Sequence, residues 1–343
     1  MKICIFSRPF YPAVGGLEAI AETLAVEFSL IGCDVEVVTD TKVSNKQNKQ
    51  FPFKIRRTSS IKERYTAFKK ADVILFMNFT FAGVPIALLS LRPIVLSHHG
   101  IYQSSGSLKI RFLEFTKKQS TRFFTNISVS QFVARNLPGK SIVVPNAFNE
   151  SLFRIQEFKR EKNFVFCGRL VSDKGANVLI DAFQIVLNTN PNATLTIIGD
   201  GPEKPALYEK SNLNGMSKNV SFAGILRGES LVNKLREHSC MVIPSLWEEP
   251  FGIVALEGIA LCDTVIASNR GGLPEAVGNC GVLVEPTAKK FADAMISVLK
   301  ALEMGMLLPG QPSLEKRRAH LEAHSPKQVA QKYLSVCQQA IDR

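Results

Sequence analysis

The chain has 343 residues, of which 45% are hydrophobic and 21% charged, so it can bury a substantial apolar interior, most readily as two domains. Its seven cysteines include no CxxC pair, which argues against a zinc finger and favours reduced thiols in the cytoplasm. The longest apolar stretch, residues 79–91, is shorter than the roughly 20 residues that cross a bilayer, and no secretion signal is expected at the N-terminus.

Positive charge is concentrated in the first part of the chain. The formal net charge is +12, and residues 1–150 hold 20 Lys and Arg against 10 Asp and Glu, a difference of +10. We therefore expect this part to favour an anionic partner or surface. Nucleic acid is not the expected partner, because the sequence has no nucleic-acid recognition motif.

Short β-branched or apolar runs alternate with helical patterns, which predicts an α/β protein with parallel sheets covered by helices on both faces. A first helix is expected after Gly15 and Gly16, because the apolar residues from Leu17 to Phe28 follow helical spacing. The strands expected in this part of the chain are 2–6, 35–39, 73–77, 94–97, 127–130 and 142–145.

A polar and charged stretch, residues 149–162, separates this series from a second one and is the expected linker between two Rossmann-like domains. The strands expected in the second series are 163–167, 194–198, 240–243, 264–267 and 282–284, with helices beginning near residues 175, 203, 229, 252 and 287. Two such units also suggest a dehydrogenase. The dinucleotide fingerprint GxGxxG is absent, however, because Lys204 stands where a third glycine should follow Gly199 and Gly201.

The most informative pattern is the stretch PSLWEEPFGIVALE. Glu249 lies in the predicted loop before a helix, and Glu257 is expected about a turn and a half inside that helix. Both carboxylates can therefore face the carboxyl end of the sheet, where open α/β sheets bind ligands. The backbone amides of Phe251, Gly252 and Ile253 are expected at the helix N-terminus, where they can bind a phosphate or sugar oxygen.

This stretch resembles the EX7E signature of the retaining glycosyltransferases of family 4. The resemblance implies the GT-B fold, in which two Rossmann-like domains face a deep cleft. It also implies that Glu249 contacts the hydroxyl groups of the donor sugar and that Glu257 contacts the ribose of the nucleotide. Transfer is then expected to retain the anomeric configuration, without a separate protein nucleophile.

A second match lies in GRLVSDKG, which resembles the family's G-R-L…K-G segment. By this resemblance Arg169 and Lys174, next to Gly168, bind the donor diphosphate. Breaking a glycosyl–phosphate bond builds negative charge on the leaving diphosphate, and two fixed cations can stabilise it. Because no DxD triplet occurs, no metal or other cofactor is expected. Gly199 and Gly201 match the family's G-x-G-P segment, which is placed to approach the base or the diphosphate.

Two motifs of the first part complete the resemblance. Gly15 and Gly16 lie in PAVGGLE, which resembles P-x-x-G-G-x-E and leaves backbone amides near the donor phosphate. His99 lies in SHHG, which resembles T-x-H-G and aligns this histidine with one that lies near the reacting sugar. A register shift of one residue places His98 there instead.

The resemblance implies an acceptor-binding domain over residues 1–150, a nucleotide-sugar-binding domain over 151–324, and a C-terminal helix over 325–343 that packs back on the first domain. The expected activity is transfer of a sugar from a UDP- or GDP-linked donor to a hydroxyl group of a glycan or lipid-linked precursor, as in polysaccharide or lipopolysaccharide biosynthesis. Two alternatives remain: a nucleotide-sugar epimerase of the same fold, and a catalytically inactive nucleotide-sugar-binding module. The EX7E signature argues against the epimerase. The complete set of Glu249, Glu257, Arg169 and Lys174 argues against the inactive module.

Residues 107–124 mix basic with apolar and aromatic side chains. Such a segment can lie on an anionic membrane, or it can be an ordinary helix with a core face and a solvated basic face. A second basic run, residues 54–70, points to the same kind of surface. The expected location is therefore cytoplasmic, with peripheral contact at the inner face of the plasma membrane.

Overall fold

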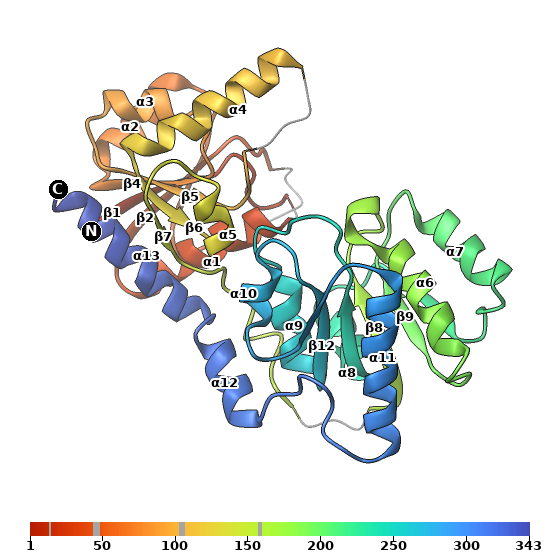
Figure 1. The fold of residues 1–343 in the computed structure, drawn as a ribbon. Coiled ribbons are helices and arrows are strands. Elements are labelled where there is room, and N and C mark those ends of the chain that lie inside the picture. Colours follow the sequence, from red (N-terminus) through yellow and green to blue (C-terminus); the bar gives the residue numbers. More distant parts are fainter. Residues whose placement is uncertain (14, 44–48, 103–106, 157–159) are drawn as a thin grey trace. The chain divides into compact units, whose positions relative to one another are not determined.

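The computed structural model describes residues 1–13, 15–43, 49–102, 107–156 and 160–343 (Figure 1). The chain divides into two compact units. The first unit comprises Met1–Ala147 and His324–Arg343, and the second comprises Phe148–Ala323. Each unit contains one parallel sheet with helices on both faces, so the predicted fold class is confirmed. The division falls just before the polar stretch in which the linker was expected.

The sheet of the first unit has seven parallel strands in the order β3-β2-β1-β4-β5-β6-β7. The strands are β1 (Lys2–Phe6), β2 (Asp34–Thr39), β3 (Lys54–Arg57), β4 (Val73–Met77), β5 (Ile94–His98), β6 (Thr125–Ser128) and β7 (Ser141–Val143). The strand order reverses between β1 and β4. At such a switch point the loops diverge and leave a crevice at the carboxyl ends of the strands.

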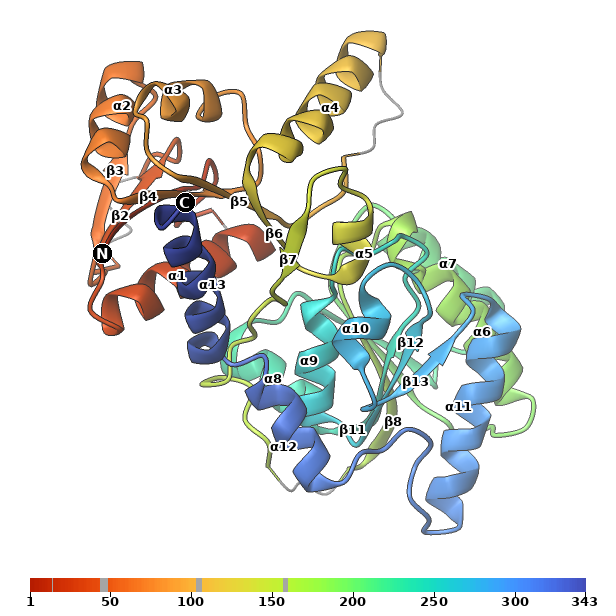
Figure 2. The same ribbon diagram turned by 60° about the vertical axis from the view of Figure 1, so that its left-hand side comes forward.

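Helices cover both faces of this sheet (Figure 2). On one face α1 (Gly16–Leu30) packs against α13 (Pro326–Ile341), and on the other α2 (Ile61–Lys70) packs against α3 (Val84–Leu89). The buried residues of α1 are Ile20, Ala21, Leu24, Ala25 and Phe28, which follow the predicted helical spacing. The remaining helices are α4 (Leu108–Ser120), which projects away from the sheet, and α5 (Gln131–Arg135).

The sheet of the second unit has six parallel strands in the order β10-β9-β8-β11-β12-β13, with its switch point between β8 and β11. The strands are β8 (Lys162–Cys167), β9 (Leu195–Ile198), β10 (Val220–Gly224), β11 (His238–Ile243), β12 (Thr264–Ser268) and β13 (Val282–Val284). The helices are α6 (Ala176–Leu187), α7 (Lys204–Leu213), α8 (Gly228–Arg236), α9 (Ile253–Leu261), α10 (Leu273–Val277), α11 (Ala288–Glu303) and α12 (Leu314–Glu322). Helix α6 packs against α7 and α11, whereas α9 packs against α8, α10 and α12.

Three sequence predictions need correction. Strand β6 ends at Ser128, earlier than the predicted 127–130, because the Ser130 hydroxyl accepts the Val133 N–H at 3.1 Å and caps α5. The run 54–70 does not form one basic surface, because it folds into β3 and α2 and buries Arg64. Strands β3 and β10 were not predicted. Both are edge strands: β3 is the basic run KIRR, and only the first residue of β10 is buried. In the described part of the chain, no helix has the length and apolar character that crossing a membrane requires.

Candidate active site

The loops that follow β8 and β11 pack on one another at the switch point of the second sheet. The backbone N–H groups of Leu246 and Trp247 donate to the Asp173 carbonyl oxygen at 2.8 and 3.0 Å. The Ser245 hydroxyl oxygen lies 3.3 Å from the same carbonyl oxygen. These contacts hold the segment that contains Lys174 against the segment that contains Glu249, although the two residues are far apart in the sequence.

Lys174 and Glu249 form an ion pair in which the Lys174 ammonium group donates to Glu249 Oε1. The two side chains are 24% and 14% exposed, so solvent screens the pair less than it would a surface pair. The Ser245 hydroxyl donates to the same carboxylate oxygen at 2.9 Å. Glu249 Oε2 has no partner among the described residues, so one oxygen of an oriented carboxylate is available to a sugar hydroxyl.

Glu257 lies in α9, which begins at Ile253 after Gly252 in a left-handed conformation with φ of 104°. Its carboxyl group is partly buried, and burial raises its pKa from 4.5 to about 7. The pKa of the Cys167 thiol is raised, first by burial and second by the Glu257 charge. Glu257 therefore lies near Cys167, the last residue of β8. The Phe251 side chain is buried and anchors the loop before α9.

Arg169 and the three predicted glycines lie at the carboxyl ends of β8 and β9. The Arg169 side chain is exposed and makes no hydrogen bond or ion pair with the described residues. Gly199, with φ of 140°, passes so close to Gly168 that an added Cβ would lie 1.8 Å from the Gly168 carbonyl oxygen. At Gly201, with φ of 159°, a Cβ would lie 2.3 Å from the Leu170 carbonyl oxygen. Because these glycines have no side chain, the backbone that follows β9 can pack directly against the backbone that follows β8, beside Arg169 and Lys174.

Gly15 and Gly16 lie at the N-terminus of α1 in the first unit. Both are exposed, and residue 14 of the same motif lies outside the described residues. Glu18 in the first turn folds back over Gly15, where an added Cβ would lie 2.4 Å from its Oε2 atom. A carboxylate is favourable at this positive end of the helix dipole. A phosphate approaching the α1 N-terminus would therefore have to share this end of the helix with Glu18.

The structure distinguishes the two adjacent histidines. His98 is fully buried, and both of its ring nitrogens have partners: Nδ1 lies 2.7 Å from the Tyr102 hydroxyl and Nε2 lies 2.9 Å from Asn126 Oδ1. His99 is only partly buried at the end of β5. Its Nε2 lies 2.8 Å from the Ser97 hydroxyl, which is also 2.6 Å from the Tyr333 hydroxyl of α13.

One ring nitrogen of His99 lacks a well-formed hydrogen bond. Its Nδ1 is buried and makes no hydrogen bond of normal geometry with the described residues, although a contact with the Asn146 side chain partly offsets the fall in the pKa of the ring. Burial, and then the nearby His98, lower the pKa of His99 to about 3, so its imidazole is neutral at pH 7. A neutral imidazole with an unpaired buried nitrogen is suited to a hydrogen bond with a ligand. His98 has no such nitrogen, because both of its ring nitrogens are hydrogen-bonded.

Sequence reasoning missed Ser245 and Asn78. Asn78 follows β4 with a positive φ of 69°, and its Oδ1 accepts the His99 N–H at 2.8 Å. A non-glycine residue in the left-handed region directly after a buried strand frequently marks a functional site, and Asn is the residue type that tolerates it best. The polar residue after the apolar run VILFM was the only signal for it in the sequence.

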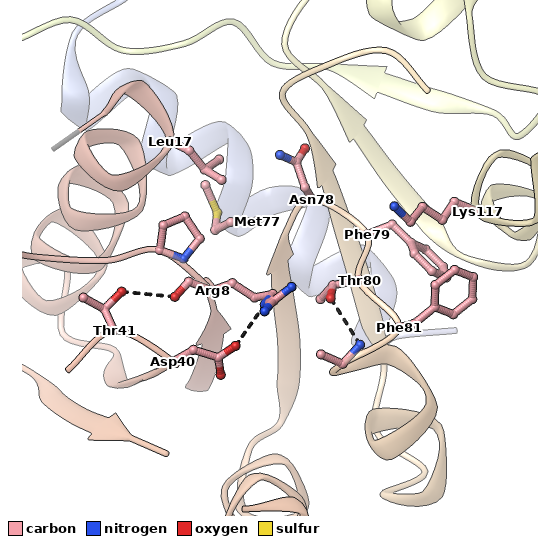
Figure 3. A pocket seen from close by; sticks show the side chains of 12 residues that line it. Arg8, Leu17, Asp40, Thr41, Met77, Asn78, Phe79, Thr80, Phe81 and Lys117 are labelled. Atoms are coloured by element: carbon pink, nitrogen blue, oxygen red, sulfur yellow. Dashed lines mark hydrogen bonds and ion pairs between the residues drawn. The ribbon is translucent and has the colours of Figure 1, made fainter. Parts of the chain in front are cut away.

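A pocket of about 690 Å³ opens at the switch point of the first sheet (Figure 3). Its walls come from the end of β4 and the segments that follow β1, β2 and β4, together with Leu17 of α1 and Lys117 of α4. Asn78 is one of the lining residues, so the pocket adjoins the backbone of His99. Among the described residues, no group of three His, Cys, Asp or Glu side chains could hold a metal ion.

The sequence of this chain is similar to those of known proteins. Residues 148–305 match the family described as glycosyl transferases group 1. Glycogen synthase of Mycobacterium tuberculosis is 36% identical over 138 residues, which cover 39% of this chain and 33% of that protein. The chain thus spans about a third of the length of that relative. An uncharacterized glycosyltransferase of Methanocaldococcus jannaschii is 29% identical over 302 residues, covering 80% of this chain and 82% of that protein.

Among solved structures, the Anabaena protein HepE in complex with UDP superposes with a TM-score of 0.82 at 18% identity, covering 99% of this chain and 100% of that one. At this identity the likeness concerns the fold. The predicted fold, two Rossmann-like domains of the GT-B type, is therefore confirmed.

Proposed function

We propose that this chain, whose residues 148–305 match the family described as glycosyl transferases group 1, is a retaining glycosyltransferase that uses a UDP- or GDP-linked sugar donor. The observation that carries the proposal is the cluster at the switch point of the second sheet. There two segments that are distant in the sequence bring Lys174 and Glu249 together, beside the closely packed backbone at Gly168 and Gly199. Such a cluster is suited to hold a sugar and a diphosphate at once.

In the proposed mechanism, the donor binds to the second unit. Glu257 accepts hydrogen bonds from the ribose, and the free oxygen of Glu249 accepts one from the donor sugar. Arg169 and Lys174 stabilise the negative charge that develops on the leaving diphosphate. Lys174 is already fixed by Glu249 before the donor arrives, so little side-chain ordering is needed during the reaction. These two cations stabilise the charge of the diphosphate, which other sugar-diphosphate sites do with a metal ion.

The first unit binds the acceptor in this proposal, and its pocket beside Asn78 is the candidate site. His99 Nδ1 is the group that we assign to the reacting sugar, because it is neutral at pH 7 and makes no hydrogen bond of normal geometry, so that a ligand can replace its contact with Asn146. The acceptor hydroxyl attacks the anomeric carbon from the face of the leaving diphosphate, which retains the anomeric configuration. The proton of that hydroxyl leaves with the diphosphate, so no separate base on the protein is required.

The acceptor is proposed to be a lipid-linked or polysaccharide precursor at the inner face of the plasma membrane. Helix α4 supports this part of the proposal because it buries no residue. Leu108, Phe112 and Phe115, spaced for one face of the helix, are 82%, 65% and 58% exposed. The same spacing places Lys109 on one side of this apolar stripe and Arg111 with Lys118 on the other. A helix of this kind can bury its apolar stripe at a bilayer surface while its cations meet anionic lipids.

A binding screen tests the donor site. UDP- and GDP-sugars are added in EDTA to the wild type, to Glu257→Ala and to Glu248→Ala, and the melting temperature is measured. Glu248 is an exposed neighbour of Glu249 and serves as the matched control. We expect one donor class to raise the melting temperature of the wild type and the control but not of Glu257→Ala. No response to any nucleotide sugar would contradict the proposed function.

A further inference from the structure

The pocket of the first unit contains more cationic than anionic groups. Arg8 follows β1, Asp40 follows β2, and Lys117 comes from α4. Figure 3 shows the side chains of Arg8 and Lys117 reaching into the pocket from opposite sides of the view. The pocket also adjoins a buried cation, Arg64, which pairs with Asp40.

Asp40 is shared by two guanidinium groups. Arg64, which is 5% exposed, pairs with its Oδ1, and Arg8 Nε donates to its Oδ2 at 2.9 Å. A buried cation is costly without a counter-charge, so Arg64 depends on Asp40 the most. Arg64 is further fixed by donating to the carbonyl oxygens of Ala82 and Thr58 at 2.8 and 3.2 Å. One carboxylate balances one cation, and Arg8, whose side chain is 59% exposed, therefore presents an uncompensated charge to the pocket.

Lys117 adds a second donor on the other side. Its ammonium group donates to Glu114 Oε1 at 2.7 Å, which uses one of its three hydrogens. Counting Arg8, Arg64 and Lys117 against Asp40 and Glu114, these groups carry one net positive charge. The remaining hydrogens of Lys117 and the guanidinium of Arg8 are thus suited to a single negative charge on a ligand.

The rest of the pocket is suited to a sugar ring. Phe79 and Phe81 stack edge to face with ring centroids 5.2 Å apart, and Phe81 is 42% exposed. Asn78 Nδ2 has no partner in the part of the chain that the structure describes, and the Thr41 hydroxyl lines the same pocket. Aromatic surface combined with a few polar groups is the usual make-up of a small-molecule site.

We infer that this pocket holds an acceptor that carries an anionic group, a phosphate or a carboxylate, between Arg8 and Lys117. The inference rests on the proposed function, in which the first unit binds the acceptor, and it adds the chemical class of that acceptor. Asn78 lines the pocket and accepts the His99 N–H, so a sugar ring that lies beside Phe81 with its anion between Arg8 and Lys117 is close to the backbone of His99.

Direct binding without a donor tests the inference separately from catalysis. The probes are octyl glucuronide and octyl glucoside, which differ only at C6, a carboxylate in the first and a hydroxymethyl group in the second. Their affinities are measured by titration calorimetry. We expect the wild type to prefer the glucuronide by about threefold or more at low salt, as for a partly exposed ion pair. The preference should vanish in Arg8→Gln, weaken in Lys117→Gln and persist in Lys69→Gln. Lys69 is the control because it is an exposed lysine of the same unit that does not line the pocket.

Equal affinity for the two probes, binding of neither, or an undiminished preference in Arg8→Gln would overturn the inference. Donor hydrolysis is measured in parallel on all variants, because Arg8 and Lys117 belong to the first unit and the proposed donor site to the second. A glucuronide preference without hydrolysis of any donor would refute the proposed function while supporting the anion site. Hydrolysis without the preference would refute the anion site alone.

Discussion

Burial and the proposed function have opposite effects on Glu257. Burial favours its neutral form, whereas the proposed ribose contact favours its ionised form. Burial raises the pKa of its carboxyl to about 7, so near neutral pH the residue exchanges between a protonated and an ionised form. Ribose hydroxyl groups bind the ionised form better, since a carboxylate is a stronger acceptor than a neutral acid. The ionised form of Glu257 is therefore costly in the unliganded protein, and the proposed ribose contact would stabilise it.

We predict that the affinity for a UDP-sugar falls by about tenfold between pH 8 and pH 6, because the fraction of ionised Glu257 falls by about that factor below a pKa of 7. Titration calorimetry with UDP-glucose or the donor chosen by the screen measures it, since a diphosphate diester has no ionisation in this range. Glu257→Gln should bind weakly at both values. A wild-type affinity that is constant from pH 8 to pH 6 would argue against Glu257 as the ribose ligand.

The same shift has a consequence for stability. Because the folded pKa is higher than the ordinary value of 4.5, the contribution of Glu257 to stability is complete below about 4.5 and is lost as the pH rises through 7. Glu257→Gln removes the ionisable group and should therefore melt at a higher temperature than the wild type at pH 8. We therefore expect Glu257→Gln to be more stable than the wild type at pH 8 and to bind the donor more weakly.

At the same scale, motifs predicted the candidate residues but not their partners. Arg169, Lys174, Glu249 and Glu257 could be located from spacing and resemblance. The Lys174–Glu249 ion pair could not, because it depends on how the loops after β8 and β11 fold on one another. The choice between His98 and His99 also needed the structure, since only burial and hydrogen bonding show which ring nitrogen is free.

At the scale of elements, helical and strand periodicity predicted the helices and strands that bury a regular apolar face, such as α1 and β4. It failed where an element has no such face. The edge strand β3 is KIRR, and its Arg56 pairs with Glu36 at 2.7 Å on the neighbouring strand instead of facing solvent as part of a basic run. Charge runs therefore need a structure before they can be assigned to a surface.

Helix α4 buries none of its residues, and the proposed membrane contact would cover its exposed apolar stripe. We predict that the wild type co-sediments with vesicles of phosphatidylcholine containing about one third phosphatidylglycerol and much less with phosphatidylcholine alone. Phe112→Ser combined with Phe115→Ser should weaken the binding by about tenfold or more, because each aromatic ring contributes roughly 1.5 to 3 kcal/mol when buried.

The control for α4 is Leu213→Ser combined with Leu307→Ser, which removes two equally exposed apolar side chains, 79% and 80% exposed, from the second unit. This variant should bind vesicles like the wild type. Equal sedimentation with neutral and anionic vesicles, or no effect of the α4 substitutions, would show that α4 is not the membrane contact.

At the scale of the whole molecule, the two units divide the proposed work. The first unit carries most of the net positive charge, the exposed helix α4 and the pocket beside His99, whereas the second carries the residues assigned to the donor. Both sheets place their candidate residues at a switch point of the strand order. Tandem α/β periodicity predicted the two sheets, but the strand order that makes these crevices is a property of the fold.

The central claim is that the protein transfers sugar from a nucleotide donor with retention and without a metal ion. The most direct measurement is proton NMR of donor turnover in EDTA, which follows the anomeric configuration of the newly formed product. We expect a product with the anomeric configuration of the donor. We also expect a rate about a hundredfold lower in Arg169→Ala, because a charge-stabilising group is lost from the transition state. A product of inverted configuration, or turnover that occurs only after a divalent metal is restored, would contradict it.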